Sequence, residues 1–202
     1  MTRRIPDLVL IKGAPGVGKS STARELAGLV KSGACVEVDA LRRMVTSVKW
    51  TDQAEHRKLL SLGVNVSCGF LRLGFSPVIL VDTFSGNKID AVIAAFRATI
   101  PDARVFVVAL HASEGVLERR VLGREAGGFR DIRVSKRINR DVASAVRPFE
   151  RVIETDEMTP GEVAVKVLNC MRGGAASGGR YSGGPRFGAF GQRGVPIRGD
   201  SR

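Results

Sequence analysis

The sequence predicts a three-layer α/β fold, in which helices cover both faces of a five-stranded, mainly parallel sheet. Short apolar runs of strand type alternate with segments of helical spacing along the first 172 residues. A chain of 202 residues, 44% of them hydrophobic and 26% charged, has room for one full-sized core. We therefore expect one globular domain at residues 1–172, followed by a disordered Gly/Arg-rich tail at residues 173–202.

Apolar runs define the expected strands, and glycine or proline residues mark the ends of several helices. Strands are expected at Leu8–Ile11, Ala34–Val38, Val78–Val81, Val105–Leu110 and Val152–Ile153. Helices are expected at Ser20–Val30, Leu41–Val48, Gln53–Leu73, Lys88–Thr99, Ser113–Arg124 and Ser135–Val146. A last helix is expected after Thr159, because Pro160 and Glu162 complete the signals of a capped N-terminus. In a sheet of this kind, ligands bind at the carboxyl ends of the strands.

A glycine-rich loop with the pattern G-x-x-x-x-G-K-[ST] follows the first expected strand. Its glycines let backbone N–H groups converge on phosphate oxygens, and the next helix presents its positive N-terminus to the same anion. Lys19 is expected to reach the β- and γ-phosphates, and the Ser20 hydroxyl is expected to bind Mg²⁺. The expected nucleotide-binding residues are Gly13, Ala14, Pro15, Gly16, Val17, Gly18, Lys19, Ser20 and Ser21. We expect ATP, although nothing in the sequence specifies adenine over guanine.

A single acid, Asp82, ends the third expected strand. An apolar strand that presents an acid to Mg²⁺, or to its water, is the usual second motif of a nucleoside triphosphate site. The alternative is that Asp82 only caps the next segment. No second acid follows it, so the pair of acids common in ATP-hydrolysing motor proteins is absent from this place.

With these motifs the chain resembles the P-loop small-molecule kinases of the AAA-type or zeta-toxin-like group, which includes polynucleotide kinase, chloramphenicol phosphotransferase and gluconate kinase. The resemblance covers roughly residues 6–172, and the segment Val36–Arg43 makes it more specific than the glycine-rich loop alone. It implies that Asp39 is the general base and that Arg42 holds the acceptor. A carboxylate beside the phosphate loop is chemically suited to accept a hydroxyl proton. The alternative role of Asp39 is to cap a helix that begins at Ala40.

A cluster of basic residues follows the fourth expected strand. It contains Arg119, Arg120, Arg124, Arg130, Arg133, Lys136, Arg137 and Arg140. The resemblance implies a mobile lid here, with hinges at Gly127 and Gly128. In it Arg124 and Arg130 stabilise the transferred phosphoryl group and Arg120 binds the nucleotide. Arg133, Arg137 and Arg140 are expected on a solvated helical hairpin instead.

Four further side chains have a functional and a structural interpretation. His56 is expected to face solvent rather than take part in catalysis. His111 lies near the edge of the site or serves a turn. Trp50 and Phe84 line the acceptor pocket or belong to the core. The loop at residues 154–160 is where the resemblance places the nucleotide base.

The net charge of +12 indicates phosphate-rich partners. Five arginines and one aspartate give the tail a charge of +4, and it also holds Tyr181, Phe187 and Phe190. Such a segment suits contact with nucleic acid by charge and stacking. The apolar runs are too short for a membrane span and no export signal is evident, so a cytoplasmic protein is expected. Three widely spaced cysteines are expected to be reduced thiols.

These observations favour an ATP-dependent kinase that phosphorylates a hydroxyl of a small molecule, with Mg²⁺ as the cofactor. Two alternatives stay open at the level of sequence. One is a polynucleotide 5′-kinase, for which the basic tail would bind RNA or DNA. The other is an NTP-dependent regulatory or binding protein. Transfer of phosphoryl to a hydroxyl separates a kinase from a switch, and salt-sensitive oligonucleotide binding separates the two kinases.

Overall fold

The sheet is entirely parallel, with the strand order β2-β3-β1-β4-β5. The structure is a computed structural model, and it describes residues 5–124 and 129–173. The strands are β1 (Leu8–Lys12), β2 (Ala34–Glu37), β3 (Val78–Val81), β4 (Val105–His111) and β5 (Arg151–Glu154). Because β1 lies in the centre, the loop that follows it emerges between β3 and β4. The five-stranded parallel sheet confirms the predicted fold class.

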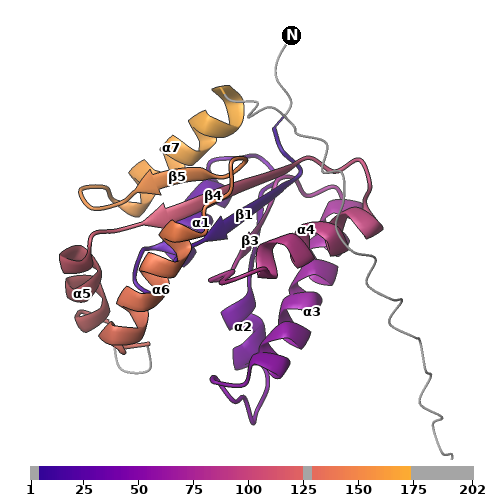
Figure 1. The fold of residues 1–202 in the computed structure, drawn as a ribbon. Coiled ribbons are helices and arrows are strands. Elements are labelled where there is room, and N and C mark those ends of the chain that lie inside the picture. Colours follow the sequence, from indigo (N-terminus) through magenta and orange to yellow (C-terminus); the bar gives the residue numbers. More distant parts are fainter. Residues whose placement is uncertain (1–4, 125–128, 174–202) are drawn as a thin grey trace, which may run out of the picture.

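Helices cover both faces of this sheet (Figure 1). They are α1 (Lys19–Gly28), α2 (Val38–Arg43), α3 (Gln53–Arg72), α4 (Lys88–Thr99), α5 (Glu114–Leu122), α6 (Ile132–Ser144) and α7 (Pro160–Gly173). Side chains alternate along β1: Val9 and Ile11 pack in the core with α1 and α7, whereas Leu8 and Leu10 pack in the core with α3 and α4. This alternation produces the three layers.

Most element bounds agree with the periodicity, but α2 does not. The predicted helix Leu41–Val48 is wrong, because α2 spans Val38–Arg43 and turns follow it. The N-cap of α2 is Glu37, so Asp39 lies in the first turn and the capping alternative for Asp39 is wrong. The helix ends early because the Arg42 guanidinium donates to the carbonyls of Lys49 and Trp50 and thereby holds the following chain in a loop.

Side-chain caps set the starts of α6 and α7. The Asp131 carboxylate accepts from the Val134 N–H at 2.9 Å, so α6 begins three residues before the predicted start at Ser135. At α7 the Thr159 N–H donates to Glu162 Oε2 at 2.7 Å, and the Glu162 N–H donates to Thr159 Oγ1 at 3.3 Å. This reciprocal pair is the capping arrangement predicted for α7.

The last residue of β1 is a buried charge. Lys12 is 1% exposed, and its Nζ lies 2.6 Å from Oε2 of Glu150, whose side chain is also buried. Arg147 lies 3.7 Å from the other Glu150 oxygen and pairs at 2.5 Å with Asp90 on α4. The ion-pair chain therefore connects β1, the segment before β5 and α4, and Lys12 directly precedes the glycine-rich loop.

The three cysteines are free thiols, as predicted. Burial, followed by the charge of Glu37, raises the pKa of Cys35 to about 11, so this thiol is inert at neutral pH. Within residues 5–124 and 129–173, none of the helices combines the length and apolar character that a membrane span requires. The predicted tail (apart from Gly173, which ends α7) and the hinge glycines Gly127 and Gly128 lie outside the described residues.

Candidate active site

The loop between β1 and α1 needs its glycines for two separate reasons. Gly13, Gly16 and Gly18 have φ angles of 154°, 99° and 95°, which L side chains rarely adopt. A Cβ at Gly16 would also lie 2.7 Å from Val121 Cγ2, so the loop packs tightly against α5. Gly18 is the N-cap of α1 and has no side chain that could cover the helix N-terminus. The backbone therefore forms an anion-binding cradle.

Lys19 lies at the centre of this cradle. Its Nζ donates to the Ala14 carbonyl at 2.9 Å. Burial lowers the pKa of Lys19 to about 8, although the Asp39 and Asp82 carboxylates nearby favour its charged form, and Arg124 lowers the pKa further. The structure thus brings together four predicted site residues from α1, α2, the end of β3 and the end of α5.

A cavity of about 250 Å³ adjoins the glycine-rich loop. Its walls come from Gly16, Val17, Gly18, Ser21, Thr22, Arg120, Arg124, Thr155, Met158, Pro160 and Val163. Arg120 donates to Thr155 Oγ1 at 2.9 Å and to the Thr155 carbonyl at 2.6 Å, which joins α5 to the loop after β5. This loop is the one expected to hold the nucleotide base. Walls that combine apolar and polar side chains beside a phosphate cradle are suited to a heterocyclic ring.

Asp39 and Arg42 differ sharply in exposure. Asp39 is exposed, and no ion pair holds it within the described part of the chain. Arg42 is 4% exposed, its Nη2 donates to the Lys49 and Trp50 carbonyls at 3.1 and 3.0 Å, and its guanidinium carbon lies 4.6 Å from the centroid of the Trp50 ring. Arg42 therefore shapes the loop after α2, and Trp50 is half-exposed on that loop.

Asp82 is buried and hydrogen-bonded through both carboxylate oxygens. His56 Nε2 lies 3.0 Å from Oδ1, and the Phe84 N–H donates to Oδ2 at 3.2 Å. Burial opposes ionisation of Asp82. The contacts with His56 and Phe84 and the charge of Lys88 nevertheless hold the pKa of this carboxyl below its usual value. Phe84 is 1% exposed and packs in the core with α3 and α4, so its core interpretation is correct.

The prediction that His56 faces solvent is wrong, because His56 is 6% exposed. Its other ring nitrogen, Nδ1, lies 3.3 Å from Lys88 Nζ, which also donates to Gln53 Oε1 at 3.0 Å. The sequence contains a signal for this burial: His56 precedes the buried residues Leu60 and Val64 at helical spacing. Lys88 and Gln53 carry no comparable signal, because their contact depends on how α3 and α4 meet.

The basic residues after β4 separate into two groups. Arg133, Arg137 and Arg140 are exposed, as predicted. Arg124 is half-buried near Lys19 and Asp39, and its Nη1 donates to the Phe129 carbonyl at 3.3 Å. Arg130 is exposed and donates to the Arg124 carbonyl. Of this cluster, Arg120 and Arg124 line the cavity beside the glycine-rich loop.

His111 has structural partners. Its Nδ1 lies 2.7 Å from Glu154 Oε2, and its Nε2 lies 3.0 Å from the Asn139 amide nitrogen. Asn139 also donates to the Ala112 carbonyl at 2.7 Å. These contacts connect the ends of β4 and β5 to α6, which fits the turn interpretation.

The residues near Lys19 suit Mg²⁺ only together with a nucleotide. Among the described residues, no group of three or more His, Cys, Asp or Glu side chains forms a metal site. Mg²⁺ usually takes one or two protein oxygens, with phosphates and waters completing its octahedron. Ser20 is half-buried and Asp82 is buried, and these are the two residues whose oxygens the sequence predicts for such an ion.

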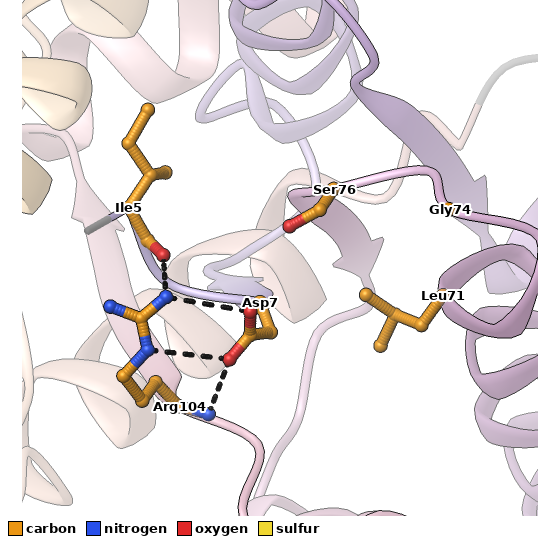
Figure 2. A pocket seen from close by; sticks show the side chains of 6 residues that line it. All are labelled: Ile5, Asp7, Leu71, Gly74, Ser76 and Arg104. Carbon is orange, nitrogen blue, oxygen red and sulfur yellow. Dashed lines mark hydrogen bonds and ion pairs between the residues drawn. The ribbon is translucent and has the colours of Figure 1, made fainter.

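A second cavity, of about 470 Å³, lies at the opposite edge of the sheet. Figure 2 shows Arg104 turned toward Asp7 and the Ile5 carbonyl, and its Nε lies 3.4 Å from Asp7 Oδ2. Asp7 and Arg104 precede β1 and β4, so this cavity is at the amino ends of the strands. Its charged groups already satisfy each other, and nothing in its walls resembles reactive chemistry.

Comparison with known proteins agrees with this geometry. The profile of a family described as an AAA domain (AAA_33) matches residues 8–149, so the chain belongs to this family. No protein of curated function matches the sequence. The tunicamycin resistance protein of Deinococcus radiodurans has a similar structure, with a TM-score of 0.61 and 20% identity, over 82% of this chain and 94% of that one.

Two kinases also share the fold. A gluconokinase from Sinorhizobium meliloti 1021 matches with a TM-score of 0.58 and 20% identity, over 84% of this chain and 93% of that one. A sugar kinase from Janibacter sp. HTCC2649 matches with a TM-score of 0.59 and 20% identity, over 81% and 93%. The strand order and the glycine-rich loop agree with these matches, so the fold is the one that these kinases share. The family match places the chain among the AAA_33 domains, in line with the resemblance that the sequence predicts.

Proposed function

We propose that this protein is an ATP-dependent kinase that transfers the γ-phosphoryl group to a hydroxyl of a small molecule. The observation that carries the proposal is the position of Asp39. This exposed carboxylate lies near enough to Lys19 to influence its pKa, and no cation of the described residues pairs with it. A free base beside a phosphate cradle is the arrangement that transfer to an alcohol requires.

Each residue has one role in this mechanism. When bound, ATP supplies the phosphoryl group and Mg²⁺, held through Ser20 and Asp82, offsets its charge. Asp39 accepts the proton that the acceptor hydroxyl loses. Lys19 and Arg124 contribute positive charge beside the transferred group, and Arg130 is proposed to join them. Arg120 positions the loop that borders the base, and Arg42 holds the loop against which the acceptor lies.

The small-molecule class of the acceptor is supported by the similar structures, whose names refer to gluconate, sugars and tunicamycin. A polynucleotide 5′-kinase is the alternative, favoured by the charge of +12 and by the arginines and aromatic residues of the C-terminal segment. An NTP-dependent regulatory protein would need no acceptor at all. The cytoplasm stays the expected compartment.

The test is the substitution Asp39→Asn, assayed with radiolabelled ATP and an acceptor found by screening hydroxylated small molecules. We expect transfer to fall by about 10²–10⁴-fold, because the base is lost. Nucleotide affinity and melting temperature should stay near those of the wild type, since Asp39 is exposed and caps nothing. Asp141→Asn, at another exposed helical aspartate, is the matched control. Full activity in the Asp39→Asn variant would mean that the base lies elsewhere.

A further inference from the structure

Lys88, the first residue of α4, has an unusual environment for a lysine. It is half-buried, and its Nζ contacts an amide oxygen, Gln53 Oε1, at 3.0 Å and a ring nitrogen, His56 Nδ1, at 3.3 Å. Within residues 5–124 and 129–173, no carboxylate oxygen lies within 4.0 Å of this ammonium. A charge that is partly removed from water without a counter-ion is unfavourable, and an incoming anion would relieve it.

The other lysines of the described chain show what Lys88 lacks. Four of them are not fully exposed: Lys12, Lys19, Lys88 and Lys136. Lys12 pairs with Glu150 at 2.6 Å, and Lys136 pairs with Glu118 at 2.7 Å. Lys19, which belongs to the phosphate cradle, has only the Ala14 carbonyl. Lys88 therefore resembles Lys19, because neither ammonium is paired with a carboxylate of the described residues.

The charges around Lys88 strengthen this parallel. Burial lowers its pKa, the charge of Asp82 favours the ammonium form, and Arg42 and Arg57 lower the pKa further. Two cations, Arg42 and Arg57, and one carboxylate, Asp82, thus lie close enough to act on Lys88. That carboxylate is already bonded to His56 and to the Phe84 N–H. The local excess of positive charge lies at the N-terminus of a 12-residue helix, whose dipole also favours an anion.

The position of Lys88 connects it to the acceptor rather than to the nucleotide base. His56 joins it to Asp82 at the end of β3, and Asp82 in turn acts on Lys19. The cavity beside the glycine-rich loop is lined by α1, the arginines of the α5 end and the loop after β5, and contains neither Lys88 nor His56. Lys88 therefore lies on the α2–α3–α4 side of the cradle, where Asp39 is located.

We propose that Lys88 binds an anionic group, a carboxylate or a phosphate, carried by the phosphoryl acceptor. The proposal rests on the kinase function proposed above and narrows it to hydroxylated acceptors with a negative charge. The Lys88 ammonium, held in place by Gln53 and His56, orients the acceptor through this charge, so that its hydroxyl is presented to Asp39. A neutral alcohol of the same shape would lose this contact.

The experiment uses the full chain with its cradle filled by the non-hydrolysable analogue AMPPNP and Mg²⁺. Inorganic phosphate and acetate are titrated at constant ionic strength, with glycerol as the neutral probe, by calorimetry and by the fluorescence of Trp50. Trp50 is the only tryptophan and lies against Arg42. We expect saturable binding of phosphate or acetate, at least tenfold weaker in Lys88→Gln, and no response to glycerol. The two anions together show which oxyanion the site prefers.

Two further variants keep the result interpretable. Lys58→Gln, at an exposed lysine of α3, should bind the anions like the wild type, and Lys88→Arg should retain most of the affinity because the charge is kept. Equal anion affinity in wild type and Lys88→Gln, or no saturable binding in wild type, would overturn the inference. Failure to bind AMPPNP would instead count against the proposed function, and calorimetry measures that binding first.

Discussion

His56 Nε2 lies 3.0 Å from Asp82 Oδ1 in the interior of the protein, and this contact joins α3 to the end of β3. The other ring nitrogen of His56, Nδ1, lies 3.3 Å from Lys88 Nζ. The chain of contacts from Lys88 through His56 to Asp82 therefore holds the carboxylate in place at the end of β3.

The first prediction follows from this contact. His56→Ala should lower the free energy of unfolding by roughly 1–3 kcal/mol, because Asp82 would lose a hydrogen bond inside the protein. His56→Gln should recover part of the loss, since the amide nitrogen of glutamine can take the place of Nε2. Lys58→Ala, on the exposed side of the same helix, should change stability by less than about 0.5 kcal/mol. Urea unfolding measures all three, and equal stability of the alanine variant and wild type would argue against a structural role for the bond.

The second prediction concerns the buried pair of Lys12 and Glu150. Replacing one partner, as in Glu150→Leu, should destabilise the fold by roughly 3–5 kcal/mol, because an uncompensated ammonium would stay buried. The double variant Lys12→Met with Glu150→Leu should recover most of this loss, since two apolar side chains of similar volume can fill the same space. Thermal unfolding of the four proteins forms a double-mutant cycle. Additive losses in the double variant would mean that the two charges do not depend on each other.

The third prediction uses the pKa of Lys19, which burial lowers to about 8 in the free protein. Phosphates favour the ammonium, so nucleotide binding should raise this pKa and take up a proton wherever free Lys19 is neutral. The uptake should therefore grow from about 0.2 proton per nucleotide at pH 7.4 to about 0.9 at pH 9. Calorimetry of ADP binding in buffers of different ionisation enthalpy measures it.

Lys19→Arg serves as the control for this measurement, since a guanidinium stays charged throughout the range and should show no such rise. The sign is opposite to that of a group whose pKa falls on binding, which would release protons. A wild-type uptake that does not change between pH 7.4 and pH 9 would show that Lys19 is already charged in the free protein.

The sequence predicts those parts of the site that depend on local pattern. Gly13–Ser20 and Asp82 follow recognisable apolar strands, so their places at the carboxyl edge of the sheet can be inferred from order alone. Arg42 shows the limit of local pattern, because its burial depends on carbonyls seven and eight residues further on. The environments of Lys88 and Glu150 cannot be predicted from local pattern, since their contacts come from helices and strands that are distant in sequence.

The fourth prediction separates the small-molecule kinase from the polynucleotide kinase through residues 174–202, which lie outside the described part of the structure. If the acceptor is a small molecule, deleting this segment should leave turnover unchanged. The free energy of unfolding should stay within about 0.5 kcal/mol of that of the full chain. If the acceptor is a nucleic acid, the deletion removes five arginines and three aromatic residues. Affinity for a single-stranded oligonucleotide should then fall, and its dependence on salt should flatten by about 0.7 log unit per lost phosphate contact.

We expect the first outcome, because the charges around Lys88 and Lys19 already provide the folded domain with sites for small anions. Fluorescence anisotropy of a labelled oligonucleotide at several salt concentrations distinguishes the two. Tight binding at physiological salt that disappears on deletion would identify the polynucleotide kinase.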